Sequence, residues 1–202
     1  TPVRLTSPNV RTMDRLAGTL GKKLMMDSAV VAQHFADSAF CRQYGYDTAT
    51  MACLFIPNTY EVYWNTSLED FMKRMQKENT IFWNKERLRL AEAAGLTPNE
   101  VVTLASIVDE ETANNAEKPM VAGMYINRLR TGMPLQADPT VKFALHDFSL
   151  RRIYHNHLNV ESPYNTYRNT GLPPGPIRIP SIAGIDAVLN HVKHDYLYMC
   201  AK

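Results

Sequence analysis

The sequence predicts an α+β protein in which a small helical N-terminal portion, residues 1–50, precedes a larger domain, residues 51–202. Apolar residues recur at helical spacing in several segments, and most of these segments begin at a residue able to cap a helix. Extended segments at residues 1–9 and 195–200 supply the β component. A chain of 202 residues with 45% hydrophobic residues is long enough to bury a substantial core.

Composition excludes several functional classes. The net charge is +2, from 22 basic and 20 acidic residues, and neither sign forms a long block, so a nucleic-acid-binding surface is not expected. Cys41, Cys53 and Cys200 are odd in number and lack a CxxC pair, which argues against a disulfide framework or zinc site. No run of about 18 apolar residues is present, so we expect this chain to be soluble. It begins at Thr1 without a methionine and ends within a strand-like segment, which indicates a piece of a longer protein.

The N-terminal portion contains an extended lead-in, residues 1–9, and a mostly helical stretch, residues 11–40. Asp27 or Ser28 can cap a second helix within that stretch. We find no catalytic constellation here. The residues predicted to face a core are Leu16, Leu20, Leu24, Val30, Val31 and Phe35.

The next segment, residues 54–64, is apolar but interrupted by Pro57, and the sequence leaves strand and loop equally open. Ser67 then opens a helix that places Leu68, Phe71, Met72 and Met75 on one face. A further helix is predicted from about Asn84 to Ala94, ending at Gly95.

Residues 97–112 form the most informative stretch, a capped helix that ends in three consecutive carboxylates. Thr97, Pro98 and Glu100 match a capping box with proline in the first turn. At about 100° per residue, Glu111 falls at the edge of the apolar stripe, half in the core and half in a cleft, whereas Glu110 points the opposite way. A carboxyl placed there loses hydration, and its pKa rises toward that of a general acid working near neutral pH. A solvated acidic helix end is the alternative.

The residues after this helix predict two more helices. Pro119 helps to start the first, which reaches Arg130 and ends at Gly132. Asp138 and Pro139 suit the cap and first position of the second, which extends to about Leu145, and Asp138 can equally serve a functional site. Residues 155–157 are His-Asn-His, but no spaced acidic or cysteine partner accompanies the histidines, so a surface loop is favoured over a metal site.

Residues 162–167 and 171–177 cannot form a helix or a central strand because prolines and glycines interrupt them. We predict a stiff loop that lines a binding cleft, in which tyrosines stack on rings and Asn165 recognises amides. The alternative is that the tyrosines anchor the loop on the core. Ser181 can cap a helix to about Asn190, and residues 195–200 alternate as in a closing strand.

Four separated motifs, in this order and spacing, closely resemble the endolytic murein transglycosylases of the MltG, or YceG-like, type. They lie at residues 55–60, 104–112 and 126–141, and at 164–167 together with 171–177. Tyr196-Leu197-Tyr198 is similar to the late strand of that family, so the resemblance covers residues 54–201. It is faint before residue 54, where the family has a membrane anchor and a LysM-like subdomain. Only the end of that subdomain is expected here.

The resemblance implies a lysozyme-like catalytic core that cleaves the β-1,4 bond between N-acetylmuramic acid and N-acetylglucosamine without water, leaving a 1,6-anhydromuramyl end. The family's catalytic glutamate is the second acid of a Glu-x-Glu-Thr pattern and corresponds to Glu111, while Asp109 replaces the first glutamate. No metal or cofactor is implied. The residues expected to bind and orient the sugars are Gln136, Asp138, Tyr164, Asn165 and Tyr167.

The resemblance also sets expectations for the longer protein. It is expected to be anchored in the cytoplasmic membrane, with the catalytic domain on the outer, periplasmic face near the proteins of cell-wall synthesis. The family continues past the late strand into a hairpin with a Gly-x-His-x-Phe pattern, whereas Lys202 ends this chain, so its catalytic domain is expected to be truncated.

Two alternatives remain. One is a muramidase that hydrolyses the same bond with water, using Asp138 as a second carboxylate. The other is a non-catalytic peptidoglycan-binding module. Nucleic-acid binding through Tyr164, Tyr167 and the scattered basic residues would be strongly salt-dependent, and the near-neutral charge disfavours it.

Overall fold

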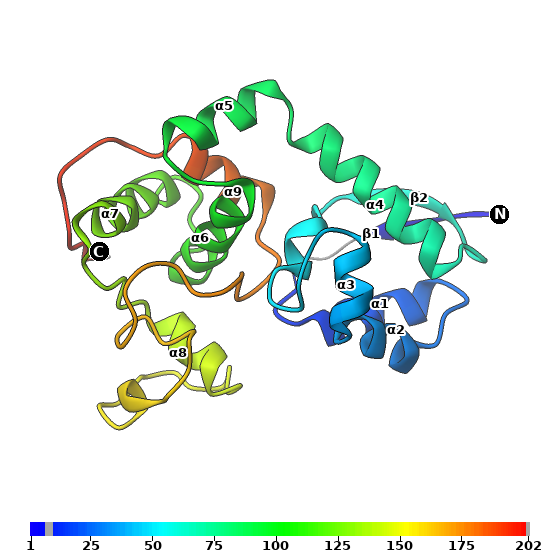
Figure 1. Cartoon of the computed structure of the whole chain (residues 1–202), viewed down its shortest axis with the longest axis horizontal. Coiled ribbons are helices and arrows are strands. Elements are labelled where there is room, and N and C mark those ends of the chain that lie inside the picture. Colours follow the sequence, from blue (N-terminus) through cyan, green and yellow to red (C-terminus); the bar gives the residue numbers. More distant parts are fainter. Residues whose placement is uncertain (7–9, 201–202) are drawn as a thin grey trace.

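The chain folds into two lobes that lie side by side and are joined along one edge by two consecutive helices (Figure 1). This computed structural model describes residues 1–6 and 10–200. The first lobe contains β1 (Pro2–Thr6), α1 (Met13–Lys23), α2 (Ser28–Phe35), α3 (Ser38–Gln43), the 3₁₀ turn η1 (Met51–Leu54), β2 (Thr59–Tyr63) and α4 (Leu68–Phe82). The second contains α5 (Lys85–Ala93), α6 (Pro98–Glu111), α7 (Lys118–Thr131), α8 (Asp138–Ala144), the 3₁₀ turn η2 (His157–Asn159) and α9 (Ile182–Leu189). The helix-dominated α+β prediction is confirmed, whereas the LysM-like and lysozyme-like assignments stay predictions.

A two-stranded antiparallel sheet supports the first lobe. β1 and β2 pair with Leu5 opposite Tyr60 and Val3 opposite Val62. Tyr60 and Val62 are buried while their neighbours are exposed, as expected for a strand with one face on a core. The choice between strand and loop at residues 54–64 is therefore resolved as a loop at residues 55–58 followed by strand β2. Residues 7–9 of the predicted extended lead-in lie outside the described residues.

The helical N-terminal stretch forms α1, α2 and α3. Asp27 caps α2 by accepting hydrogen bonds from the backbone N–H groups of Ala29 and Val30, at 2.8 and 3.3 Å. One core prediction is wrong, because Val30 is 45% exposed. Val31 and Phe35 are four residues apart and form the buried stripe of this short helix, and Val30 lies about 100° away from Val31.

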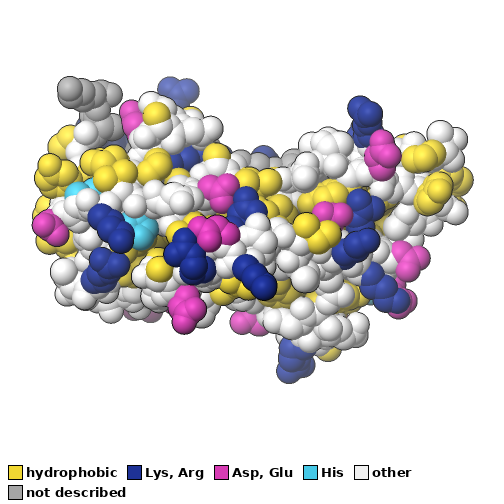
Figure 2. Space-filling view, turned by 90° about the horizontal axis from the view of Figure 1, so that it is seen from above, with side chains coloured by type: hydrophobic (Ala, Val, Ile, Leu, Met, Phe, Trp, Pro, Cys, Tyr) yellow, Lys and Arg dark blue, Asp and Glu magenta, His cyan; other side chains and the backbone are white. Residues whose placement is uncertain are grey.

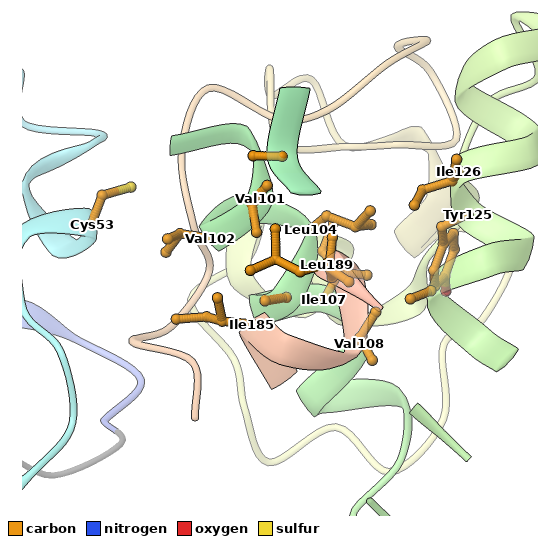
Figure 3. Close-up of a cluster of buried hydrophobic side chains, with 14 of the residues drawn as sticks. Cys53, Val101, Val102, Leu104, Ile107, Val108, Tyr125, Ile126, Ile185 and Leu189 are labelled. Atoms are coloured by element: carbon orange, nitrogen blue, oxygen red, sulfur yellow. The ribbon is translucent and has the colours of Figure 1, made fainter. Parts of the chain in front are cut away.

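Helix α6 runs through the middle of the second lobe and is buried on every side from Val101 to Val108. Figure 3 shows its side chains directed toward α9 on one side and toward Tyr125 and Ile126 of α7 on another. The sequence predicted a single apolar stripe, so the complete burial is a correction. Two buried hydroxyls are accommodated by local bonds. Thr103 donates to the carbonyl of Asn99 at 2.8 Å, and Ser106 donates to that of Thr103 at 2.6 Å.

Helix α4 contributes to both hydrophobic clusters, and Cys53 and Ile56, which precede it, already pack in the cluster of the second lobe. Phe71, Met72 and Met75 pack in the cluster of the first lobe, as their common helix face predicted, whereas Phe82 packs in that of the second. The division at residue 50 stays a prediction. No helix in the described residues has the length and apolar character needed to cross a bilayer.

Residues 191–200 run alongside α7 without regular secondary structure, so the predicted closing strand is wrong. Side chains of α7 take the place of a partner strand. The Asn127 amide donates to the carbonyls of His194 and Tyr196 at 2.6 and 3.0 Å, and Arg128 donates to that of Leu197 at 2.8 Å. Three carbonyl groups of the segment are therefore satisfied without a sheet.

Candidate active site

The three carboxylates at the end of α6 lie in three different environments, and Asp109 is the most enclosed. Its side chain is 2% exposed and forms an ion pair with Lys118, which is 7% exposed, at 2.8 Å. Asp109 also accepts hydrogen bonds from the backbone N–H and the hydroxyl of Ser181, at 2.6 and 3.1 Å. This carboxylate thus joins the end of α6 to the starts of α7 and α9. Of the three acids, Asp109 takes the interior position.

Glu110 points away from the core of α6, as the helical spacing predicted, but it meets two arginines. Arg11, from the segment before α1, approaches it at 3.1 Å, and Arg178, from the loop before α9, approaches it at 2.9 Å. The Glu110 side chain is 17% exposed. It therefore contributes to the contact between the two lobes.

Glu111 is the most exposed of the three and lies on the wall of a pocket of about 320 Å³ between the end of α6 and α7. Thr112, Met120, Met124 and Tyr125 contribute to the same pocket. The position is therefore open to a ligand from outside, whereas Asp109 and Glu110 are occupied by partners within the protein.

The surroundings of Glu111 raise the pKa of its carboxyl. Partial removal of water by the surrounding protein is the largest cause, and the negative charge of Asp138 adds to it. Hydrogen bonding with the Tyr125 hydroxyl and the positive charges of Lys142 and Arg128 act in the opposite direction. The carboxyl is thus accessible on its pocket side yet partly desolvated, as expected for a group that donates a proton to a bound substrate.

Asp138 and Tyr167 form a hydrogen-bonded pair near Glu111. The Tyr167 hydroxyl donates to the Asp138 carboxylate, and burial together with this bond raises the pKa of Tyr167. The predicted capping role of Asp138 is wrong, because Ala137 occupies the cap position of α8 and makes no side-chain capping bond. The sequence left open two roles for Asp138, a helix cap or a functional-site residue. Its position beside Tyr167 and near Glu111 supports the second role.

The other predicted sugar-binding residues divide into exposed and structural positions. Gln136 is exposed and has a positive φ of 51°, and its backbone N–H donates to the carbonyl of Thr166 at 3.2 Å. Asn165 is fully buried, and its amide donates to the carbonyls of Leu158 and Val160, both at 2.9 Å. Both N–H groups of this amide are committed to its own loop, and the sugar-binding role of Asn165 stays a prediction that this placement does not favour.

Tyr164 also departs from the expected position. Its ring packs on Phe143 with centroids 4.7 Å apart, and it lines a pocket between the lobes rather than the pocket that contains Glu111. The anchoring alternative is therefore supported for Tyr164, whereas the Tyr167 hydroxyl bonds to the carboxylate of Asp138.

Sequence reasoning missed Tyr125 and Arg128. Tyr125 lies on the buried side of α7, and the available signal was that a buried tyrosine hydroxyl usually needs a polar partner. Arg128 is 7% exposed and donates to the carbonyls of Leu135 and Leu197. It thereby fixes the chain before α8 and the C-terminal segment, and only the tertiary structure reveals this role.

The histidines at 155 and 157 occupy a surface region near η2, and a ring nitrogen of His157 accepts from the backbone N–H of Tyr154 at 3.0 Å. Across residues 1–6 and 10–200, no group of three or more His, Cys, Asp or Glu side chains is arranged to hold a metal ion. Figure 2 shows basic and acidic side chains interspersed on the face that it presents, in keeping with the small net charge.

Comparisons with known proteins agree with one another. The model of the YceG-like family matches residues 1–202. The endolytic murein transglycosylase of Bacillus subtilis is 38% identical over 138 residues, which are 68% of this chain and 38% of that protein. The endolytic murein transglycosylase of Streptococcus pneumoniae R6 is 33% identical over 153 residues, covering 72% of this chain and 27% of its own length. The aligned part is thus well under half of either relative.

A solved structure extends the likeness to the fold. The crystal structure of a YceG-like protein from Listeria monocytogenes matches with a TM-score of 0.82 and 30% sequence identity. The match covers 100% of this chain and 71% of the Listeria chain. Both lobes described above therefore have counterparts in a crystal structure.

Proposed function

The chain belongs to the YceG-like family, and on that premise we propose that it is an endolytic peptidoglycan lytic transglycosylase. It cleaves the β-1,4 bond between N-acetylmuramic acid and N-acetylglucosamine without water and leaves 1,6-anhydromuramyl ends. The observation that carries the proposal is Glu111, a carboxyl of raised pKa on the wall of a pocket, at the end of the central helix. The names of the Bacillus and Streptococcus relatives support the same reaction class.

One carboxyl serves both halves of the proposed reaction. Protonated Glu111 donates its proton to the glycosidic oxygen as the bond from that oxygen to C1 of the muramic acid breaks. The resulting carboxylate then takes the proton of the C6 hydroxyl while the C6 oxygen bonds to C1. Glu111 ends as it began, and no water is consumed. The raised pKa keeps the carboxyl protonated to higher pH than an ordinary glutamate, which the first half requires.

Neighbouring groups are assigned supporting roles. We assign sugar binding to Asp138 and Tyr167, whose charge and hydroxyl lie close enough to interact with Glu111, and to the exposed Gln136. The replacement of the family's first glutamate by Asp109 should alter fine tuning more than the mechanism, because Asp109 contacts Lys118 and Ser181 within the protein.

The test compares the native chain, Glu111→Gln and a matched control, Glu92→Gln, which makes the same change at an exposed position of α5. Each is incubated with purified peptidoglycan, and the soluble products are identified by mass spectrometry. We expect anhydromuramyl ends from the native chain and from Glu92→Gln, and a loss of at least about 100-fold for Glu111→Gln. Equal yields from all three would refute the role of Glu111.

Hydrolysis by a muramidase is the second candidate, and the charge of Asp138 acting on Glu111 favours it, since a second carboxylate could activate water. Digestion in ¹⁸O-labelled water separates the two reactions. Hydrolysis gives labelled reducing ends, whereas transglycosylation gives unlabelled anhydro ends. A non-catalytic binding module would release no products, and its glycan binding would survive Glu111→Gln.

We also propose that the longer protein is anchored in the cytoplasmic membrane with this part on the outer face, close to cell-wall synthesis proteins. The location of the substrate supports this orientation. Protease added to intact spheroplasts of the source organism should digest the catalytic part of the full-length protein. Protection until the membrane is lysed would contradict the orientation.

A further inference from the structure

An ion-pair cluster connects the first lobe to the residue immediately before Glu111. The guanidinium of Arg11 contacts both oxygens of Glu110, through Nε at 3.1 Å and Nη2 at 3.4 Å. Arg178 contacts the same carboxylate at 2.9 Å from the second lobe. Two lobes and two sequence-distant segments therefore meet at Glu110.

The surroundings of Arg11 restrict its motion. Its guanidinium lies 5.5 Å from the centre of the Phe148 ring, and its side chain is 39% exposed, while that of Glu110 is 17% exposed. A two-point contact between a guanidinium and a partly shielded carboxylate has a defined geometry, unlike a mobile surface pair. The contact thus fixes position as well as balancing charge.

The end of α6 needs such fixing. Carboxylates at a helix C-terminus oppose the helix dipole, and the last turn lacks onward backbone partners. The final backbone bond of α6 runs from the Thr112 N–H to the Val108 carbonyl at 3.2 Å. Asp109 is held by the second lobe alone, so Arg11 is a contribution from the first lobe to this turn.

We propose that Arg11 is a positioning residue, which acts through Glu110 to fix the last turn of α6 and the direction of the Glu111 carboxyl. The first lobe thereby influences the proton-transfer step without contacting the substrate. The kinetic part of this inference rests on the proposed transglycosylase function, whereas the structural part does not.

The chain offers a closely matched control. Arg87 of α5 contacts both oxygens of Asp186 in α9, at 3.1 and 3.3 Å, and lies 4.0 Å from the Phe82 ring. It repeats the Arg11 arrangement, including the aromatic contact, at a carboxylate that is not adjacent to Glu111. Arg87→Met therefore measures the general cost of losing such a pair.

The experiment compares the native chain with Arg11→Met, Arg11→Lys and Arg87→Met. Turnover is measured on purified glycan strands, and hydrogen–deuterium exchange is followed at the amides of residues 108–112. Because small displacements of a reacting group lower rates steeply, we expect kcat to fall about tenfold in Arg11→Met with KM changed less than about twofold. Arg11→Lys should recover part of kcat, and Arg87→Met should match the native chain. Exchange at residues 108–112 should be faster in Arg11→Met alone.

Two results would overturn the proposal. One is native kcat and native exchange in Arg11→Met. The other is an equal change of both in Arg87→Met, which would indicate a general loss of stability. If the native chain makes no product, the proposed function fails, and exchange then decides: faster exchange in Arg11→Met alone supports the positioning role, and unchanged exchange refutes it.

Discussion

The two ends of α6 are held in contrasting ways. At its start, Thr97 accepts from the N–H of Glu100 at 3.2 Å, and the Glu100 carboxylate accepts from the N–H of Thr97 at 3.0 Å. At its end, Asp109 and Glu110 are held by groups from α7, from the loop before α9 and from the first lobe. One end depends on four consecutive residues, and the other depends on the folded molecule. The candidate catalytic residue, Glu111, lies at this second end of the helix.

The two ends of α6 therefore have different roles. A local cap specifies where a helix begins at small energetic cost, but it cannot orient a side chain against groups from elsewhere in the fold. A catalytic carboxyl needs contacts with groups from elsewhere in the fold, because these neighbours set both its direction and its pKa. Changes at the start of α6 should therefore affect stability alone, and changes at its end should affect stability, catalysis or both.

The largest effect on stability is expected from Lys118→Met, which leaves the carboxylate of Asp109 buried without its cation. Breaking a buried pair in this way costs about 3–5 kcal/mol of unfolding free energy. Urea unfolding at pH 7 measures it. The control, Arg89→Met, removes an exposed pair with Glu86 and should leave the curve unchanged within error. Similar unfolding curves for both variants would contradict the claim that the buried ion pair of Asp109 and Lys118 stabilises the end of α6.

The next effect concerns the pH dependence of kcat/KM. Glu111 must be protonated to act as an acid, so activity falls as pH rises through its raised pKa. Asp138→Asn removes a charge that raises this pKa, and the alkaline limb should move to lower pH. At pH 7 we expect about tenfold lower kcat/KM, part of it from the lost partner of Tyr167. Asp70→Asn, an exposed change in α4, should leave the limb in place, and an alkaline limb that does not move in Asp138→Asn would exclude this coupling.

A smaller effect in the opposite direction is expected from Tyr125→Phe. Hydrogen bonding with the Tyr125 hydroxyl lowers the pKa of Glu111, so its removal should move the alkaline limb to higher pH. Loss of one hydrogen bond, about 1 kcal/mol, should lower kcat about fivefold. Tyr60→Phe is the matched control, because it removes a buried hydroxyl bonded to the Ile56 carbonyl at 2.6 Å in the other lobe. A shift in the same direction as Asp138→Asn would contradict the assigned roles.

The smallest effect is expected at the start of the helix. Thr97→Ala removes the capping hydroxyl and should cost about 1 kcal/mol of unfolding free energy. Calorimetry should detect a lower Tm, while kcat at temperatures well below Tm stays unchanged. Ser67→Ala, which removes the equivalent cap of α4, should behave alike. A fall in kcat specific to Thr97→Ala would show that the two ends are coupled through the helix.

The sequence predicted where most helices begin, but it predicted less well how segments pack against one another. The caps at Asp27, Ser67 and Ser181 are present as predicted. Residues 195–200 alternate like a strand, yet the side chains of Asn127 and Arg128 satisfy part of their backbone. Periodicity reports which face of a segment is apolar, but not whether another strand lies beside it.

The sequence by itself determined the mainly helical fold class, the start and end of α6, the position of Glu111 as its last residue and the likeness to the YceG-like family. These features depend on groups within a few residues of one another or on motif order. Only the tertiary structure decided that Asp109 is the enclosed acid, that the amide of Asn165 is buried and bonded within its own loop, and that Arg11 reaches Glu110. Ser181 lies 72 residues from its partner Asp109 in the sequence, and Arg11 lies 99 residues from its partner Glu110. Burial and charge pairing between such distant residues cannot be predicted from a local sequence pattern.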